Sequence, residues 1–137
     1  MPTYRGGCHC GAVRVVFEGR FDPGRLPVRA CQCAFCRAHG ARTAADPEGR
    51  VRFEGPLRRY RFGLRTADFL LCPDCGVYLG ALHADDAGAW ATLNVNCLDE
   101  RALFPAAPAP VSYEGESAEG RSARRKARWT PAETGTA

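Results

Sequence analysis

Seven of the eight cysteines in this 137-residue chain fall into three short clusters. The clusters are Cys8-x-Cys10, Cys31-x-Cys33-x2-Cys36 and Cys72-x2-Cys75. These spacings are too tight for comfortable disulfides within a cluster, but they suit chelation of a metal ion. Thiolate-rich sites select zinc or an iron–sulfur cluster over magnesium or calcium. The chain is therefore expected to fold around metal-binding cysteines.

The clustered cysteines divide into a set of four and a set of three. The first set is Cys8, Cys10, Cys72 and Cys75, and the second is Cys31, Cys33 and Cys36. Four cysteines close a tetrahedral zinc site, which contributes folding energy and leaves no position for chemistry. Three cysteines leave one position for water, a substrate or another residue. We expect two zinc ions per chain, one structural and one catalytic.

Short runs of alternating apolar and polar residues predict a mainly β fold. The runs lie at residues 12–18, 51–53, 59–62 and 90–95. Helical signals are short: one turn over residues 37–39 that Gly40 ends, and a short helix over residues 98–104 with Asp99 as its cap. The sequence therefore predicts antiparallel sheets with few helices.

Residues 1–104 are expected to form one compact domain. From Pro105 the composition changes to Pro, Ala, Gly and Glu, with a basic run at residues 121–128. These residues include too few apolar side chains to order themselves, so residues 105–137 are predicted to be a mobile, disordered tail. The start of the chain has no signal-peptide pattern and no stretch resembles a membrane span, so we expect a cytoplasmic location and no membrane partner.

Three motifs occur in a fixed order: G-G-C-H-C-G-A-V-R, C-Q-C-A-F-C-R-A-H-G-A and C-P-D-C-G-V-Y-L. In this respect residues 5 to about 104 resemble the glutathione-dependent formaldehyde-activating enzyme (GFA) family, which includes the centromere protein V group. The resemblance implies a beta-tent fold, a structural zinc on the set of four cysteines and a catalytic zinc on the set of three. It also implies carbon–sulfur lyase or S-(hydroxymethyl)glutathione synthase activity, as used in formaldehyde detoxification. The chain departs from the family at Ala34, where serine is frequent, and at Cys97, which replaces a small residue.

The chemistry of a zinc held by three thiolates favours a thiol substrate. Such a site carries a net charge of about −1, so it is better suited to hold a fourth thiolate than to polarise a carbonyl. A coordinated thiol stays ionised at neutral pH and can attack formaldehyde or a similar small carbonyl. We expect a low-molecular-weight thiol and a small carbonyl as substrates. Glutathione, mycothiol and bacillithiol would all offer the same sulfur.

Other interpretations of the same residues stay open. The set of three could be a second structural zinc site, completed by Cys97 or His39. The chain could also be a non-catalytic, zinc-stabilised module that binds protein or nucleic acid. The absence of aromatic residues interleaved with the basic run weakens the nucleic-acid version, because only Trp129 adjoins it. A third interpretation is a relation to methionine sulfoxide reductase B, with Cys97 as the late catalytic thiol. The chain lacks that enzyme's tryptophan-proline pocket motif, so this interpretation ranks last.

Several single residues near the motifs have both a functional and a structural interpretation. Arg37, Arg42 and Arg61 could hold the carboxylates of a peptide thiol, or could simply be solvated surface residues. His9 and His39 are expected to be packing residues rather than ligands. The remaining cysteine, at position 97, is expected to be a small buried apolar side chain and not a ligand.

Overall fold

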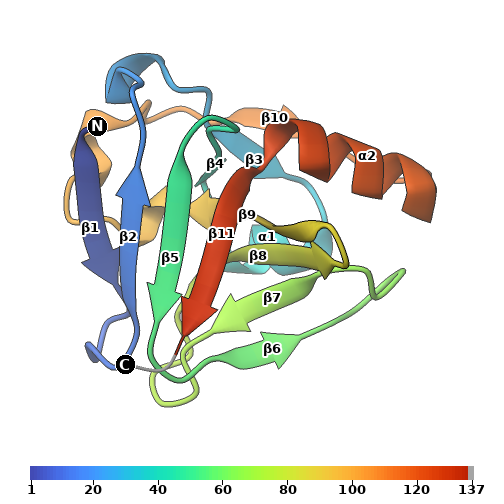
Figure 1. Ribbon diagram of the computed structural model, residues 1–137, viewed down its shortest axis with the longest axis horizontal. Helices are drawn as coiled ribbons and strands as arrows, with labels where there is room; N and C mark the ends of the chain where they lie inside the picture. Colours follow the sequence, from blue (N-terminus) through green and yellow to red (C-terminus); the bar gives the residue numbers. More distant parts are fainter. Residues whose placement is uncertain (136–137) are drawn as a thin grey trace.

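The computed structural model describes residues 1–135 and shows a mainly β fold with a few short helices (Figure 1). In chain order the elements are β1 (Thr3–Gly7), β2 (Arg14–Glu18), η1 (Pro23–Arg25), β3 (Arg29–Cys31), α1 (Ala34–His39), β4 (Thr43–Ala44), β5 (Arg50–Glu54), β6 (Arg58–Tyr60), β7 (Asp68–Leu71), β8 (Tyr78–Asp85), β9 (Gly88–Asn94), η2 (Val95–Cys97), η3 (Arg101–Leu103), β10 (Ala109–Val111), α2 (Ala118–Arg128) and β11 (Thr130–Gly135). The η elements are single 3-10 turns. The predicted mainly β class is confirmed.

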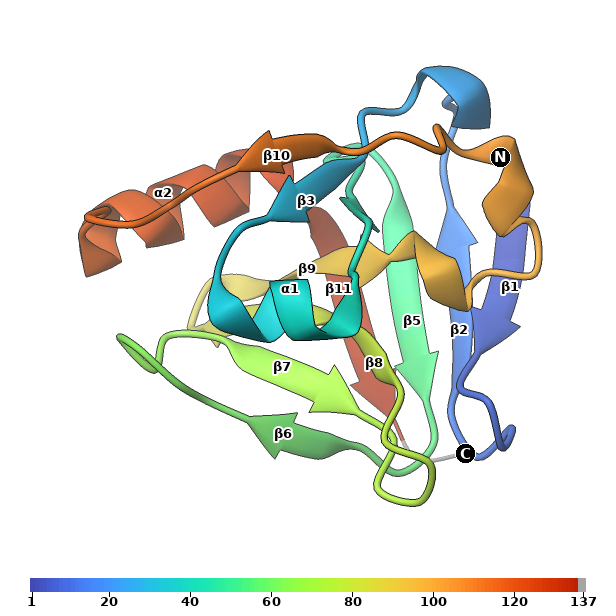
Figure 2. The same ribbon diagram turned by 180° about the vertical axis from the view of Figure 1, so that it is seen from behind.

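The strands form one branched sheet. Its main path is β1-β2-β5-β11-β9-β4-β3-β10, and β8, β7 and β6 branch from β9. Figure 2 shows β1, β2, β5 and β11 side by side, with β6, β7 and β8 running across their direction. Most pairs are antiparallel as predicted, but β11 pairs with β5 and β10 with β3 in parallel. Both parallel strands belong to the C-terminal segment.

The core includes the buried faces of β2 and β5, as the alternation of apolar and polar residues predicts. Val15 and Phe17 of β2 are buried, and they pair across the strands with Phe53 and Val51 of β5. Arg14, between the buried positions Val13 and Val15, faces solvent. Burial of an aliphatic or phenyl side chain of this size stabilises a fold by about 1.5–3 kcal/mol. The buried faces of β2 and β5 therefore form part of the core beside the loop that contains Cys8 and Cys10.

The C-terminal segment is folded, so the prediction of a mobile tail over residues 105–137 is wrong for the described part of that range. β11 lies between β5 and β9, and its first residue, Thr130, is 1% exposed. Helix α2 begins at Ser117, whose hydroxyl accepts a hydrogen bond from the Gly120 amide over 3.0 Å. The predicted division at residue 104 therefore runs through a single sheet. Residues 136 and 137 of the predicted tail lie outside the described residues.

Polar contacts explain why composition misjudged this segment. The guanidinium carbon of Arg124 lies 3.6 Å from the centroid of the Tyr113 ring, and its nitrogens form a two-point ion pair with Glu116. Lys126 pairs with Asp85 of β8. The composition rule counts apolar residues, whereas cation–π contacts and ion pairs fasten this helix to the sheet.

In residues 1–135 no helix is long and apolar enough to cross a membrane.

The predicted helix over residues 98–104 is also wrong. This region contains only one 3-10 turn, η3, preceded by η2 at Val95–Cys97, and Asp99 caps neither of them. The backbone N–H of Asp99 donates instead to the carbonyl of Arg5 in β1 over 2.8 Å. Because the chain is tied to an edge strand at this point, it does not continue as an α-helix. Cys97, just before this region, is the last residue of the 3-10 turn η2.

Candidate metal centres and the adjoining cavity

The set of four cysteines comes together from two distant parts of the chain. The Sγ atoms of Cys8, Cys10, Cys72 and Cys75 all lie within 4.8 Å of one another. Cys10 Sγ is 3.7 Å from Cys8 Sγ and 3.6 Å from Cys72 Sγ. Two sulfurs bound at 2.3 Å to a tetrahedral zinc lie about 3.8 Å apart. The spacing of these thiols therefore fits a zinc ion.

Backbone amides point at the sulfurs of this group, as in zinc knuckles. The amide of Val13 donates to Cys8 Sγ over 3.2 Å, and the amides of Asp74 and Cys75 donate to Cys72 Sγ over 3.4 Å. Gly76 has a φ of 79°, a conformation that favours glycine and lets the loop fold back on Cys72. Hydrogen bonds to sulfur stabilise the thiolate, which is the form that binds metal.

The set of three cysteines lies where β3 enters α1. Cys31 ends β3, Cys33 caps the helix, and Cys36 is in its first turn. The Sγ atom of Cys33 accepts a hydrogen bond from the amide of Cys36 over 3.4 Å. The three Sγ atoms lie within 4.8 Å of one another, so this group could also hold a zinc ion. Within residues 1–135 it gains no fourth ligand.

The electrostatics of the three-cysteine group favour a thiolate. The hydrogen bond from Cys36 and the backbone N–H of Cys33 lower the pKa of Cys31 to about 5, and the charge of Arg124 acts in the same direction. The partner thiol of Cys36 has a raised pKa because it shares its proton with Cys31 and is buried. At neutral pH at least one sulfur of the group is ready to bind a cation.

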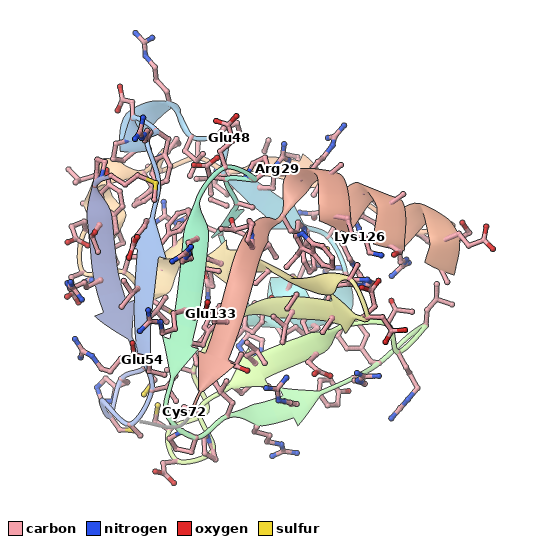
Figure 3. All side chains as sticks on the ribbon, viewed as in Figure 1. Arg29, Glu48, Glu54, Cys72, Lys126 and Glu133 are labelled. Atoms are coloured by element: carbon pink, nitrogen blue, oxygen red, sulfur yellow. The ribbon has the colours of Figure 1, made fainter. Side chains whose placement is uncertain are left out.

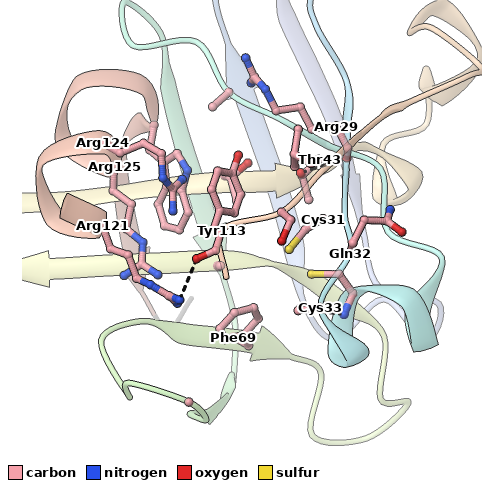
Figure 4. Close-up of a pocket in the computed structure, with 18 of the residues that line it drawn as sticks. Arg29, Cys31, Gln32, Cys33, Thr43, Phe69, Tyr113, Arg121, Arg124 and Arg125 are labelled. Atoms are coloured by element: carbon pink, nitrogen blue, oxygen red, sulfur yellow. Dashed lines mark hydrogen bonds between the residues drawn. The ribbon is translucent and has the colours of Figure 1, made fainter. Parts of the chain in front are cut away.

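A cavity of about 330 Å³ adjoins the three-cysteine group (Figure 4). All three cysteines line it, and Phe62, Phe69 and Tyr78 add apolar and aromatic surface. A cavity of this size can enclose a small ligand. The three-cysteine group therefore faces a cavity, whereas the four-cysteine group does not line it.

The opposite wall of this cavity comes from the segment that was predicted to be a tail. Four arginines of α2 line this wall, and Arg29 of β3 lines the cavity on the side of Cys31 (Figure 4). The α2 residues are Arg121, Arg124, Arg125 and Arg128. Figure 4 shows Cys31 and Cys33 on one side, Arg121, Arg124 and Arg125 on the other, and Tyr113 between them. The cavity thus has a sulfur end and a cationic end.

Cys97 and His39 do not join the three-cysteine group. The Cys97 thiol donates a hydrogen bond to the carbonyl of Tyr78 over 3.2 Å, and burial raises its pKa to about 12. His39 packs against Phe35 with the rings tilted and their centroids 4.6 Å apart. His9, next to the other group, is exposed. Neither histidine belongs to a cluster of potential ligands in the described residues.

None of the three arginines that the sequence suggested for carboxylates lines the cavity. Arg42 is used structurally, because it donates to Asn96 and to two backbone carbonyls. Arg61 pairs with Asp68 over 2.6 Å, and Arg37 is exposed on α1. The arginines of α2 were missed because their segment was expected to be disordered. The Ser117 cap followed by basic residues in the last turn is a helix signal that could have revealed them.

Comparisons with known proteins agree with this arrangement. The family model described as glutathione-dependent formaldehyde-activating enzyme matches residues 3–113. A crystal structure of a Rhodobacter sphaeroides protein is similar with a TM-score of 0.56 and 31% sequence identity, covering 78% of this chain and 99% of that one. The family match includes all seven clustered cysteines and ends before α2. On this evidence the chain belongs to the glutathione-dependent formaldehyde-activating enzyme family.

Proposed function

We propose that this chain is a zinc-dependent carbon–sulfur lyase that adds a low-molecular-weight thiol to formaldehyde or a similar small carbonyl, and catalyses the reverse reaction. In the forward direction the thiolate sulfur forms a bond to the carbonyl carbon, and the carbonyl oxygen takes up a proton to become a hydroxyl. The reverse direction breaks that carbon–sulfur bond and restores the thiol. The observation that carries the proposal is the three-cysteine group open to a cavity.

Each cysteine group has a separate role in this proposal. Cys8, Cys10, Cys72 and Cys75 would hold a structural zinc that joins the start of the fold to the loop between β7 and β8. Cys31, Cys33 and Cys36 would hold a second zinc. Bound there, zinc supplies a positive centre that keeps a coordinated substrate thiol ionised at neutral pH.

The remaining cavity residues position the substrates. The aromatic side chains of Phe62, Phe69 and Tyr78 exclude water from the reacting sulfur, which strengthens electrostatic interactions inside the cavity. Tyr78 is 2% exposed and adds a buried aromatic surface beside the three cysteines. The sulfur and the carbonyl are held together in one enclosed space, which lowers the entropic cost of their encounter.

The test is exchange NMR on the zinc-loaded chain with formaldehyde and several thiols, among them glutathione, mycothiol and bacillithiol. We expect the protein to accelerate exchange between thiol and adduct above the uncatalysed rate with at least one of them. Cys33→Ala should abolish the acceleration while leaving the fold intact. Exchange at the uncatalysed rate with every thiol would contradict the proposal and favour a non-catalytic zinc-stabilised binding module.

A further inference from the structure

Arg125 of α2 is a buried cation without an acidic partner. Its side chain is 5% exposed, and in residues 1–135 no carboxylate forms an ion pair with it. Its Nη1 atom donates to the carbonyl and the hydroxyl of Thr66, over 3.2 and 2.9 Å, and to Nδ1 of His83 over 3.3 Å. Its Nε atom is fully buried and has no hydrogen-bond partner. Burying an unpaired polar group is costly, so this arrangement requires an explanation.

The unpaired atoms of Arg125 form one edge of the guanidinium. Nη1 is fixed by its three acceptors, whereas neither Nε nor Nη2 makes a hydrogen bond in the described residues. Nε is covered by protein atoms, so Nη2 is the guanidinium nitrogen that a carboxylate in the cavity can reach. The ring of Trp129 lies 5.0 Å from the guanidinium carbon and limits its movement. The guanidinium is therefore held in place, with Nη2 left as a free donor in the described residues.

The neighbouring arginines leave a net positive charge at this end of the cavity. The carboxylate of Glu116 is shared between Arg124, at 3.1 Å, and Arg121, at 3.8 Å. Glu114, the acidic residue that lines the cavity, is exposed and forms no ion pair with these arginines. One carboxylate thus serves two arginines, and Arg125 adds a further uncompensated charge.

We propose that Arg125 binds a carboxylate of the thiol substrate, so that α2 selects acidic thiols for the reaction at the three-cysteine group. The cavity contains both ends of such a molecule's binding site, because Arg125 and Cys31 line the same space. That the ligand is a thiol rests on the function proposed above. That Arg125 binds a carboxylate does not depend on that function. The family match ends at residue 113, so this specificity element lies beyond the part of the chain that matches the family.

The subsite itself is tested by binding, without any reaction. The probe is S-methylglutathione, which carries the carboxylates of glutathione but has no thiol. In the full-length, zinc-loaded chain we expect it to shift the indole N–H NMR signal of Trp129 and not that of Trp90. Arg125→Gln should weaken this binding about tenfold, which is the effect expected for losing hydrogen bonds to a charged group. Arg25→Gln, which removes the same charge from an exposed position in η1, is the matched control and should bind as the wild type does.

The role in specificity is tested by comparing glutathione with its diethyl ester in the exchange reaction. In the wild type we expect a KM for glutathione about tenfold lower than for the ester, with similar kcat. Arg125→Gln should remove this difference by raising the KM for glutathione to that for the ester. Arg125→Lys keeps the charge without the fixed guanidinium donor, so it should restore only part of the preference. Equal KM values for glutathione and its ester in the wild type would overturn this role of Arg125 even if Arg125→Gln fails to fold.

The two proposals fail in different ways. Binding of S-methylglutathione without acceleration of exchange by any thiol would support the carboxylate subsite and overturn the proposed function. Acceleration with equal KM values for glutathione and its ester, together with an unshifted Trp129 signal, would overturn the subsite and leave the function in place.

Discussion

Nη1 of Arg125 donates a hydrogen bond to Nδ1 of His83 over 3.3 Å, which fixes the protonation state of the histidine. Because Nδ1 accepts this bond, the imidazole is neutral and its hydrogen is on Nε2. Nε2 faces the hydroxyl of Ser122 at 3.4 Å. Burial lowers the pKa of His83 from its ordinary value of 6.5, and the charge of Arg125 lowers it further. The neutral histidine thus supports the arginine that lines the cavity.

The stability of the chain should fall as the pH is lowered below 6.5. A histidine with a lowered pKa in the folded state takes up its proton first in the unfolded chain, so acid favours unfolding between 6.5 and the folded pKa. Above pH 6.5 this contribution to stability is fully present. We expect His83→Gln to show a smaller loss of melting temperature than the wild type between pH 7 and 5. His39→Gln, the same change at an exposed histidine, is the control, and parallel curves for all three proteins would contradict the argument.

Two zinc ions per chain are expected after purification under reducing conditions without chelator. The thiols fall into a group of four and a group of three, and each group has the spacing of a metal site. The measurement is metal analysis before and after addition of zinc, because an open site exchanges its metal more readily. A single zinc after zinc addition, with Cys31, Cys33 and Cys36 open to alkylation, would rule out the proposed reaction centre.

Substitutions in the two cysteine groups should have different consequences. Cys75→Ala should unfold or aggregate the chain, because it removes a ligand from the proposed zinc site that joins the start of the fold to the loop between β7 and β8. Cys33→Ala should leave a folded but inactive protein, since its group lies at the surface of the cavity. Thermal melting followed by circular dichroism distinguishes them. Equal losses of melting temperature in both variants would show that the division into structural and catalytic groups is wrong.

Removal of residues 114–137 should disrupt the fold rather than trim a tail. β11 forms a parallel ladder with β5 over Ala132–Gly135 and contacts β9 on its other side. Without it, backbone groups of β5 and β9 that pair with β11 lose their partners, and both strands gain an open edge. We expect the truncated chain to be insoluble or to lose cooperative melting. A truncated chain that melts cooperatively at the temperature of the full chain would contradict this prediction.

Local patterns allowed the two cysteine groups to be predicted from the sequence, and the absence of such patterns explains the errors in the C-terminal segment. The spacing of Cys72 and Cys75 specifies a knuckle within four residues, and alternation specifies strands such as β2. The wall formed by α2 depends on partners far away in the sequence, such as Thr66 and Asp85, and on polar contacts that composition does not reveal. The sequence consequently indicated the sulfur end of the cavity and gave no indication of its cationic end.

Cys97 decides whether the three-cysteine group is open, and we expect that it is not a ligand. Its thiol is committed to the Tyr78 carbonyl at 3.2 Å, and that carbonyl also accepts from the Asn94 side chain at 3.0 Å. A serine hydroxyl can make the same hydrogen bond, so Cys97→Ser should lower the free energy of unfolding by about 1 kcal/mol or less. The variant should keep both zinc ions and near wild-type exchange activity.

The control for this prediction is Cys36→Ser, which should lose the second zinc because a hydroxyl replaces a proposed ligand. Zinc content and exchange activity of the two variants are measured side by side. Loss of one zinc in Cys97→Ser, or a structure with the Cys97 sulfur about 2.3 Å from zinc, would mean that the site is closed. In that case a substrate thiol would have to displace Cys97, and the second centre would be structural like the first.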